Sequence, residues 1–222
     1  MTLTPDIPNP RPAAIFLCDE SGVMARPWAD AGLECWCVDV AHWIRKPRQE
    51  GNIHFVWGDC RSWAPPPEVV PVLLCGFSPC THLAVSGARD FAAKGWPMLR
   101  DGMDLFMACL FAARWARCPY LLENPVGRIS GIHHPPDLIF DPCDFGGYLD
   151  PPGDAYTKKT CLWTGGGFVM PQPKRVEPVQ GSKMHRMTPG PDRQRLRSQT
   201  PPGFAQAVFE ANRERVLATT TI

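Results

Sequence analysis

Short apolar runs alternate with polar and helix-forming stretches over the first two thirds of the chain. Five such runs span 13–18, 34–40, 53–57, 72–77 and 120–122. Near-continuous apolar runs of this length predict strands buried on both faces. Pro27 suits the first turn of a short helix ending at Gly32, and residues 98–116 carry apolar side chains at helical spacing. This repetition of strand, helix and strand predicts an α/β, Rossmann-like fold with a mostly parallel sheet and helices on both faces.

The pattern changes after Phe140, where glycine and proline become frequent and any strands must be short. A final helix is predicted with Thr200 as its N-cap and Pro201 in its first turn. We therefore expect a flexible leader over 1–12, a Rossmann-like domain over 13–170, a basic Pro-rich loop segment over 171–199, and a C-terminal helix over 200–222 that packs back on the domain.

The composition indicates a globular protein, and the placement of its cysteines indicates a reducing compartment. The 222 residues, of which 44% are hydrophobic, are typical of a globular protein, and no apolar run is long enough for a membrane span. We expect no secretory signal, because the first residues are polar and Pro-rich. Most of the ten cysteines lie inside apolar runs, where free cysteine packs as a small hydrophobe. We therefore expect neither disulfides nor a metal site, and a cytoplasmic location.

Positive charge is concentrated near the C-terminus. Residues 171–202 hold seven lysines and arginines against two acidic residues, whereas the whole chain has a net charge of only +1. A basic segment on an acidic body suits contacts with phosphate groups. A solvated loop without a partner is an equally good interpretation of the charge alone.

Reactive or polar residues follow the apolar runs directly. Asp19, Asp39, Asp59, Cys80 and Glu123 each come just past the last apolar residue of a predicted strand. In parallel α/β sheets these carboxyl ends share one edge, where ligands bind. The five residues together therefore predict a site, although a single acid at a strand end is more often a cap or a solvated turn.

The first three of these residues suit a nucleoside-containing cofactor. Asp39 can accept hydrogen bonds from ribose hydroxyls, and Asp59 can accept one from an adenine amino group. The loop 19–22 has a single glycine and lacks the dinucleotide fingerprint, so it offers few backbone amides to a pyrophosphate. This favours a cofactor with an adenosine and no phosphates, such as S-adenosylmethionine, over a nicotinamide dinucleotide.

Cys80 and Glu123 suit covalent attack on a pyrimidine ring. A thiolate that adds to carbon 6 of cytosine makes carbon 5 nucleophilic, and a carboxyl group at nitrogen 3 stabilises the charge that develops. The thiol must ionise, so it needs cations nearby. A buried structural cysteine is the alternative for Cys80, but the polar Thr81 and His82 that follow favour a functional thiol.

These motifs, in this order, resemble those of the DNA cytosine-5 methyltransferases, in particular the short proteins of this type found in phages and bacteria. The resemblance covers about residues 15–212, and its most specific parts are Phe77-Ser78-Pro79-Cys80 and Glu123-Asn124-Pro125-Val126. It implies a class I methyltransferase fold, S-adenosylmethionine as methyl donor, DNA as partner and a target base flipped out of the helix.

The resemblance also assigns roles to residues. Catalytic roles fall to Cys80, Glu123 and Lys158. Cofactor contacts fall to Leu17, Asp19, Ser21, Gly22, Asp39, Val40, Asp59, Cys60, Ser78 and Thr200. Nucleic-acid contacts fall to Ser86, Arg128, Lys159, Arg186, Arg195 and Arg197.

Three features depart from the family pattern. Asp19 and Ser21 stand where glycines are usual, and Thr160 stands where the second arginine of a base-holding motif is expected. The chain also has no room for a full target-recognition domain. Two alternatives therefore remain open: the same chemistry on a free cytosine nucleotide, single-stranded DNA or RNA, or a non-catalytic protein that binds nucleic acid or cofactor.

Overall fold

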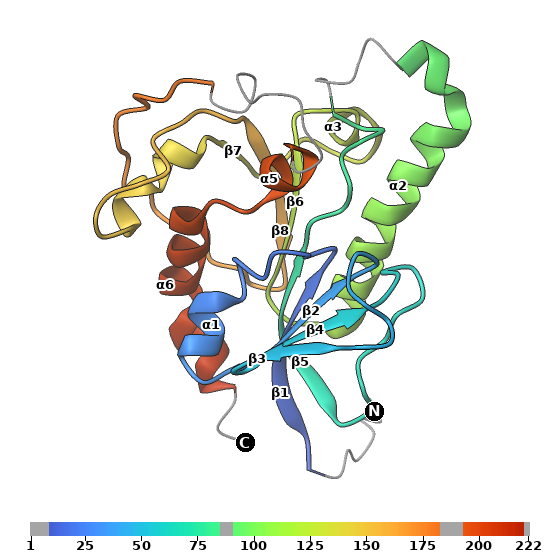
Figure 1. The fold of residues 1–222 in the computed structure, drawn as a ribbon, viewed down its shortest axis with the longest axis vertical. Helices are drawn as coiled ribbons and strands as arrows, with labels where there is room; N and C mark the ends of the chain where they lie inside the picture. Colours follow the sequence, from blue (N-terminus) through green and yellow to red (C-terminus); the bar gives the residue numbers. More distant parts are fainter. Residues whose placement is uncertain (1–8, 85–90, 183–192, 220–222) are drawn as a thin grey trace.

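The computed structural model describes residues 9–84, 91–182 and 193–219, and the side chains of 91–94 and 193–194 are not described. One eight-stranded sheet runs through the molecule, with helices on both faces (Figure 1). The strands are β1 (Arg11–Leu17), β2 (Glu34–Asp39), β3 (Arg48–Glu50), β4 (Ile53–Trp57), β5 (Val69–Gly76), β6 (Tyr120–Pro125), β7 (Leu138–Phe140) and β8 (Thr160–Gly165). The expected α/β fold with a mostly parallel sheet is confirmed.

The sheet has the order β3-β4-β2-β1-β5-β6-β8-β7. Strands β4, β2, β1, β5 and β6 are mutually parallel, and these are the five strands that the apolar runs predict. The reversed strand β8 pairs with β6 on one side and with β7 on the other. The edge strand β3 pairs antiparallel with β4, and its largely exposed Arg48-Gln49-Glu50 carries no apolar signal.

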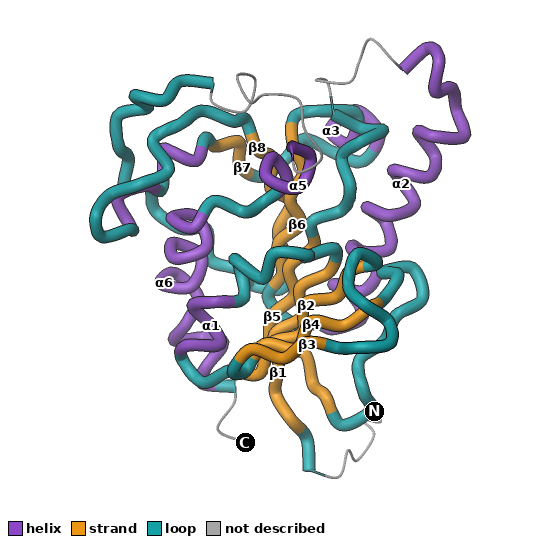
Figure 2. The backbone as a smooth tube through the Cα atoms, viewed as in Figure 1, coloured by secondary structure: helices purple, strands orange, loops and turns teal. Residues whose placement is uncertain are grey.

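Helices pack on both faces of this sheet (Figure 2). They are α1 (Arg26–Asp30), α2 (Phe91–Ala116), α3 (Ile129–Ile132), α5 (Arg193–Ser198) and α6 (Pro202–Ala218), with short 3-10 turns η2 (Pro142–Asp144) and η3 (Gly146–Tyr148). One core lies between the sheet, α1 and α6, and the other lies between the sheet and α2. Among the described residues, every helix is too short or too polar to span a membrane.

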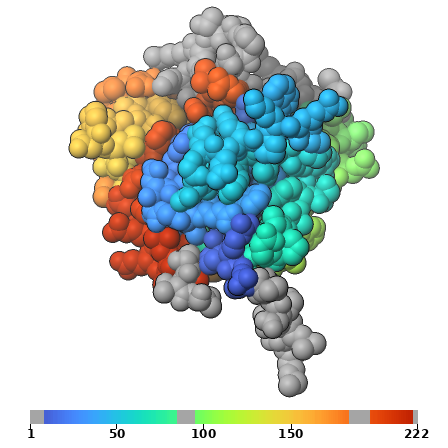
Figure 3. Space-filling view, turned by 60° about the horizontal axis from the view of Figure 1, so that its bottom comes forward, coloured from blue at the N-terminus to red at the C-terminus, as the bar shows by residue number. Residues whose placement is uncertain are grey.

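The C-terminal helix α6 packs on the body of the protein. Phe204 stacks on Phe140 with ring centroids 4.4 Å apart, and Phe209 meets Trp28 of α1 edge-on at 5.1 Å. In Figure 3 the red helix α6 lies beside the blue first part of the chain on one face. The expected N-cap is shifted by one residue, since Pro201 is the N-cap and Thr200 is buried just before it.

Two other boundaries also differ from expectation. Strand β1 begins at Arg11, inside the expected leader, because its Arg11 amide donates to the Glu68 carbonyl and Pro12 pairs with Val70. Helix α2 begins at Phe91, but its backbone is non-helical at Gly95, with φ of 63°. The regular helix thus starts close to the predicted residue 98.

Candidate active site

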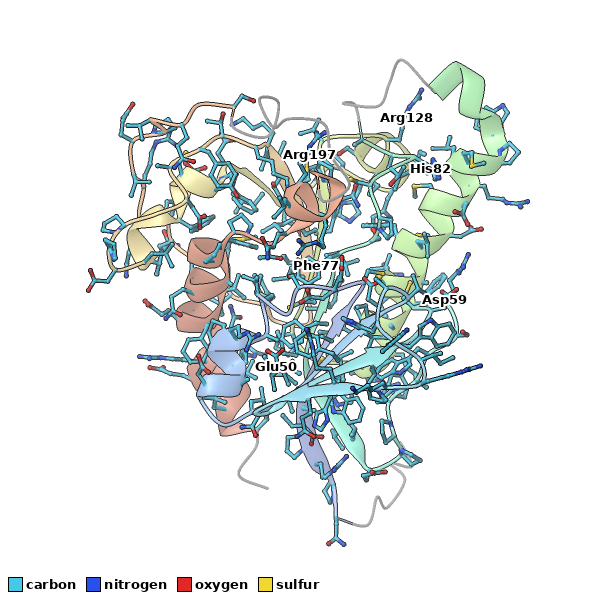
Figure 4. The ribbon with its side chains drawn as sticks, in the orientation of Figure 1. Glu50, Asp59, Phe77, His82, Arg128 and Arg197 are labelled. Atoms are coloured by element: carbon cyan, nitrogen blue, oxygen red, sulfur yellow. The ribbon has the colours of Figure 1, made fainter. Side chains whose placement is uncertain are left out.

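The five strand-end residues lie along one edge of the sheet. Asp39 is the last residue of β2, Asp19 and Asp59 follow β1 and β4 by two residues, and Cys80 follows β5 by four. Glu123 lies inside β6, two residues before its end, because the strand continues to Pro125, past the predicted residue 122. Parallel neighbours end at the same edge, so the topology brings these residues together. Phe77, His82, Arg128 and Arg197 also lie on the side toward which these strands run (Figure 4).

Cys80 lies close enough to Glu123 for the carboxylate to affect the ionisation of the thiol. Burial raises the pKa of the Cys80 thiol, the Glu123 carboxylate raises it further, and Lys158 and Arg197 lower it. Burial also raises the pKa of Glu123, and Lys158 lowers it. The site therefore joins a thiol, a carboxyl group and two cations from four segments of the chain.

Asn124 ties the end of β6 to the segment that carries Cys80. Its side chain is fully buried, and its Nδ2 donates to the Ser78 carbonyl at 2.7 Å and to the Ser78 hydroxyl at 3.2 Å. Ser78 is itself buried, two residues before Cys80. A buried amide held this way fixes the register between the two strand ends. The sequence gives Asn124 no role by itself, because its partner lies 46 residues away.

The turn that follows Cys80 rests on the segment after β6. The Cys80 carbonyl accepts from the amides of Leu83 and Ala84, and the Leu83 carbonyl accepts from the Arg128 amide. Ala84 also pairs with Gly127 in an isolated bridge. A Cβ at Gly127 would overlap the Leu83 carbonyl, so this close backbone approach requires glycine.

Lys158 and Lys159 are positioned by a buried carboxylate. Asp141 accepts the Lys158 amide at 2.9 Å and pairs with the Lys159 Nζ at 2.7 Å, which raises the pKa of Lys159. Thr160 is buried and donates to the Lys158 carbonyl at 3.0 Å. Thr160 therefore tightens this turn instead of reaching toward a base. Spacing along the chain does not reveal Asp141, 17 residues before Lys158.

The acids at the cofactor end are engaged by their own neighbours. The buried Asp19 Oδ1 accepts the amides of Ser21 and Gly22 at 2.9 and 2.8 Å. Burial raises the pKa of Asp19 and outweighs these hydrogen bonds, which lower it. Gly22 has φ of +67°, and a Cβ there would lie 2.7 Å from the Phe55 ring. Asp19 thus occupies two amides of a loop that could otherwise bind an anion.

Asp39 and Asp59 differ in the contacts that their carboxylate oxygens already make. The half-buried Asp39 accepts the Ala41 amide at 2.8 Å, and burial raises its pKa, while the neighbouring Val40 is 60% exposed. Both carboxylate oxygens of Asp59 instead accept hydrogen bonds from the Arg61 guanidinium, whose Nε lies 2.9 and 3.1 Å from them. These hydrogen bonds lower the pKa of Asp59. Leu17 and Cys60 are buried beside these acids.

The predicted nucleic-acid contacts are spread over several segments. Arg128 and Arg195 are exposed, and Arg197 is half-buried. Ser86 and Arg186 lie outside the described residues. In the basic segment, Lys174 pairs with Glu210, and Arg175 pairs with Asp144. These two cations of the segment are therefore already compensated by the body of the protein.

No protein-family model and no curated protein matches this chain. Its assignment to a class of protein therefore depends on the site and the topology.

Proposed function

We propose that this protein is an S-adenosylmethionine-dependent DNA cytosine-5 methyltransferase with the class I methyltransferase fold. The strand order supports the fold: the five parallel strands are followed by β8, a reversed strand inserted between β6 and the edge strand β7. The resemblance of the sequence motifs leads us to expect a mostly parallel sheet with helices on both faces, and the reversed strand β8 is an addition to that expectation.

The observation that carries the proposal is the pairing of Cys80 with Glu123 at neighbouring strand ends. Beyond the effect of burial, the Glu123 carboxylate raises the pKa of the Cys80 thiol, and Lys158 lowers the pKa of both groups. A carboxyl group with a raised pKa holds its proton to higher pH than a free one, and the protonated form is the one that can protonate nitrogen 3 of a pyrimidine. A thiolate stabilised by Lys158 and Arg197 can attack carbon 6.

In the proposed reaction, the Cys80 Sγ forms a bond to carbon 6 while Glu123 gives a proton to nitrogen 3. Carbon 5 thereby gains the electron density it needs to accept a methyl group, which S-adenosylmethionine would supply when bound, with S-adenosylhomocysteine as the leaving group. Loss of the proton on carbon 5 to a base then expels the Cys80 thiolate, and the proton on nitrogen 3 returns to Glu123.

The cofactor end fits an adenosine-containing donor without phosphates. Asp39 offers a carboxylate to ribose hydroxyls, and the exposed Val40 offers an apolar surface beside it. The amides that Asp19 occupies leave few for a pyrophosphate. Asp59 would have to exchange its Arg61 contacts for an adenine amino group.

A covalent adduct tests the nucleophile directly. DNA containing 5-fluorocytosine should trap Cys80 after methyl transfer, because fluorine cannot leave carbon 5 as a proton does. We expect a cofactor-dependent adduct with the wild type and none with Cys80→Ser, and Cys118→Ser serves as a control at a buried cysteine elsewhere in the fold. The assignment fails if Cys80→Ser forms as much adduct as the wild type.

A second candidate keeps this chemistry and changes the substrate to single-stranded nucleic acid or a free cytosine nucleotide. It is favoured by the path of residues 171–181, which hydrogen-bond back to the body through Val176, Gln180 and Gly181 instead of building a separate recognition unit. Methyl transfer should be compared on duplex, single strand and mononucleotide at equal cytosine. A preference for the mononucleotide would overturn DNA as the substrate.

A third candidate is a non-catalytic protein that binds nucleic acid or cofactor. It is motivated by the loop 19–22, where Asp19 already accepts a backbone amide, and by the buried Thr160, which donates to the Lys158 carbonyl. Calorimetry with S-adenosylmethionine separates the candidates, since an enzyme of the proposed class must bind it and absence of heat at any tested concentration would leave only the third.

A further inference from the structure

We propose that Cys18, Cys60 and Cys109 form a binding site for a thiophilic divalent cation of the zinc type. Their three Sγ atoms all lie within 4.8 Å of one another. The site is distinct from the Cys80 centre, and the proposal does not depend on the methyltransferase function.

The three thiols come from separate parts of the fold. Cys18 follows β1, Cys60 follows β4, and Cys109 projects from α2. Because they lie far apart along the chain, no short cysteine motif in the sequence predicts this cluster. Cys60 and Cys109 are buried and Cys18 is half-buried, so the cluster lies at the margin of the core with one side within reach of solvent.

The spacing is close to what a metal needs. Zinc bonds thiolate sulfur at about 2.3 Å in a tetrahedral arrangement, which sets sulfur atoms about 3.8 Å apart. The present sulfur positions are at most 1 Å wider than that, given their limit of 4.8 Å. Small rotations of three side chains, without backbone movement, would close this difference.

The backbone at Cys18 favours this placement. Cys18 adopts φ of 58°, which a non-glycine residue seldom does, while its amide donates to the Val38 carbonyl at 2.7 Å. Such a conformation is retained where surrounding contacts or a ligand require it. It turns the chain at the end of β1 from the strand into the loop 19–22.

Charge also suits a divalent ion. Binding releases three thiol protons to solvent and leaves three thiolates with one M²⁺, a net charge of −1. The Arg61 guanidinium lies close enough to Cys60 to offset part of this charge. Water on the half-exposed Cys18 side can supply the fourth ligand. A bound ion would join α2 to the two loops that carry Asp19 and Asp59.

Cobalt(II) provides a direct spectroscopic test on the reduced protein. We expect one equivalent of Co²⁺ to produce intense thiolate-to-metal charge-transfer absorption and the visible bands of tetrahedral cobalt, and Zn²⁺ to displace it. Cys60→Ala and Cys109→Ala should each lose these bands and weaken Zn²⁺ binding at least about tenfold, as expected for loss of one ligand of three. Cys118→Ala, a buried cysteine outside the cluster, should bind as the wild type does.

The outcomes are decisive in both directions. Absence of charge-transfer bands in the wild type, their retention in both Cys60→Ala and Cys109→Ala, or a disulfide joining two of the three cysteines in freshly reduced protein would overturn the proposal. Circular dichroism without metal checks that each variant folds. Because the assay uses no DNA or S-adenosylmethionine, its failure is distinguishable from failure of the methyltransferase proposal.

Discussion

The two ends of the candidate site are built in different ways. At the cofactor end each acid is held by its immediate neighbours: Asp19 by Ser21 and Gly22, Asp39 by Ala41, and Asp59 by Arg61. At the catalytic end the contacts join distant segments, as Asn124 does with Ser78 and Asp141 does with Lys158.

This difference separates two physical tasks. Local hydrogen bonds shape a loop, but they use the same carboxylate oxygens that a ligand would need. Long-range contacts fix one segment relative to another and leave the reactive groups themselves available. The geometry of the proposed catalytic end is therefore preorganised, whereas a ligand at the proposed cofactor end would have to compete with contacts that the chain already makes.

The largest effect on the catalytic end is expected from a substitution at Gly127. We expect Gly127→Ala to reduce the rate of 5-fluorocytosine adduct formation about a hundredfold, because its Cβ would displace the Leu83 carbonyl and with it the turn after Cys80. Gly131→Ala is the matched control, since a Cβ there has no heavy atom within 4 Å. Equal rates for the two variants would show that this close approach does not position Cys80.

The electrostatics of the same end predict a pH dependence. Lys158 lowers the pKa of Cys80, so Lys158→Met should raise it, and the thiolate that is present only above this pKa should appear at higher pH. Iodoacetamide labelling of the Cys80 peptide, followed by mass spectrometry, should then slow about tenfold near pH 7.5 and approach the wild-type rate in strong alkali. This labelling requires no substrate and so measures the thiol alone.

Lys174→Met is the control for this measurement, because Lys174 pairs with Glu210 on the C-terminal helix. An identical labelling profile for Lys158→Met and the wild type would remove Lys158 from the catalytic group. A parallel displacement of both variants would indicate a general effect of net charge instead.

The contrast between the ends also explains what the sequence could predict. The five parallel strands follow from apolar runs, and their shared edge follows from the parallel topology, so the set Asp19, Asp39, Asp59, Cys80 and Glu123 could be found without coordinates. The local turns at Asp19 and Asp39 are also within reach, because aspartates commonly accept amides two or three residues ahead.

The remaining features depend on contacts between distant segments. The bond from Asn124 to Ser78, the position of Asp141 under Lys159, and the meeting of Cys18, Cys60 and Cys109 have no pattern along the chain. Strand β3 gives no apolar signal because its residues are polar and mostly exposed, and β7 is too short, at three residues, to show a pattern. Hydrophobic periodicity carries no signal for such elements.

The smallest expected effect concerns the cofactor end. Arg61 contributes a solvent-exposed ion pair to Asp59, and such pairs hold their partners only weakly. We expect Arg61→Gln to tighten S-adenosylmethionine binding by less than about fivefold in calorimetry, because the freed Asp59 carboxylate becomes available to an adenine amino group. Arg48→Gln, on the edge strand β3, is the control and should leave the affinity unchanged. If Arg61→Gln instead weakens binding, the arginine itself contacts the cofactor, and the competition inferred at this end does not exist.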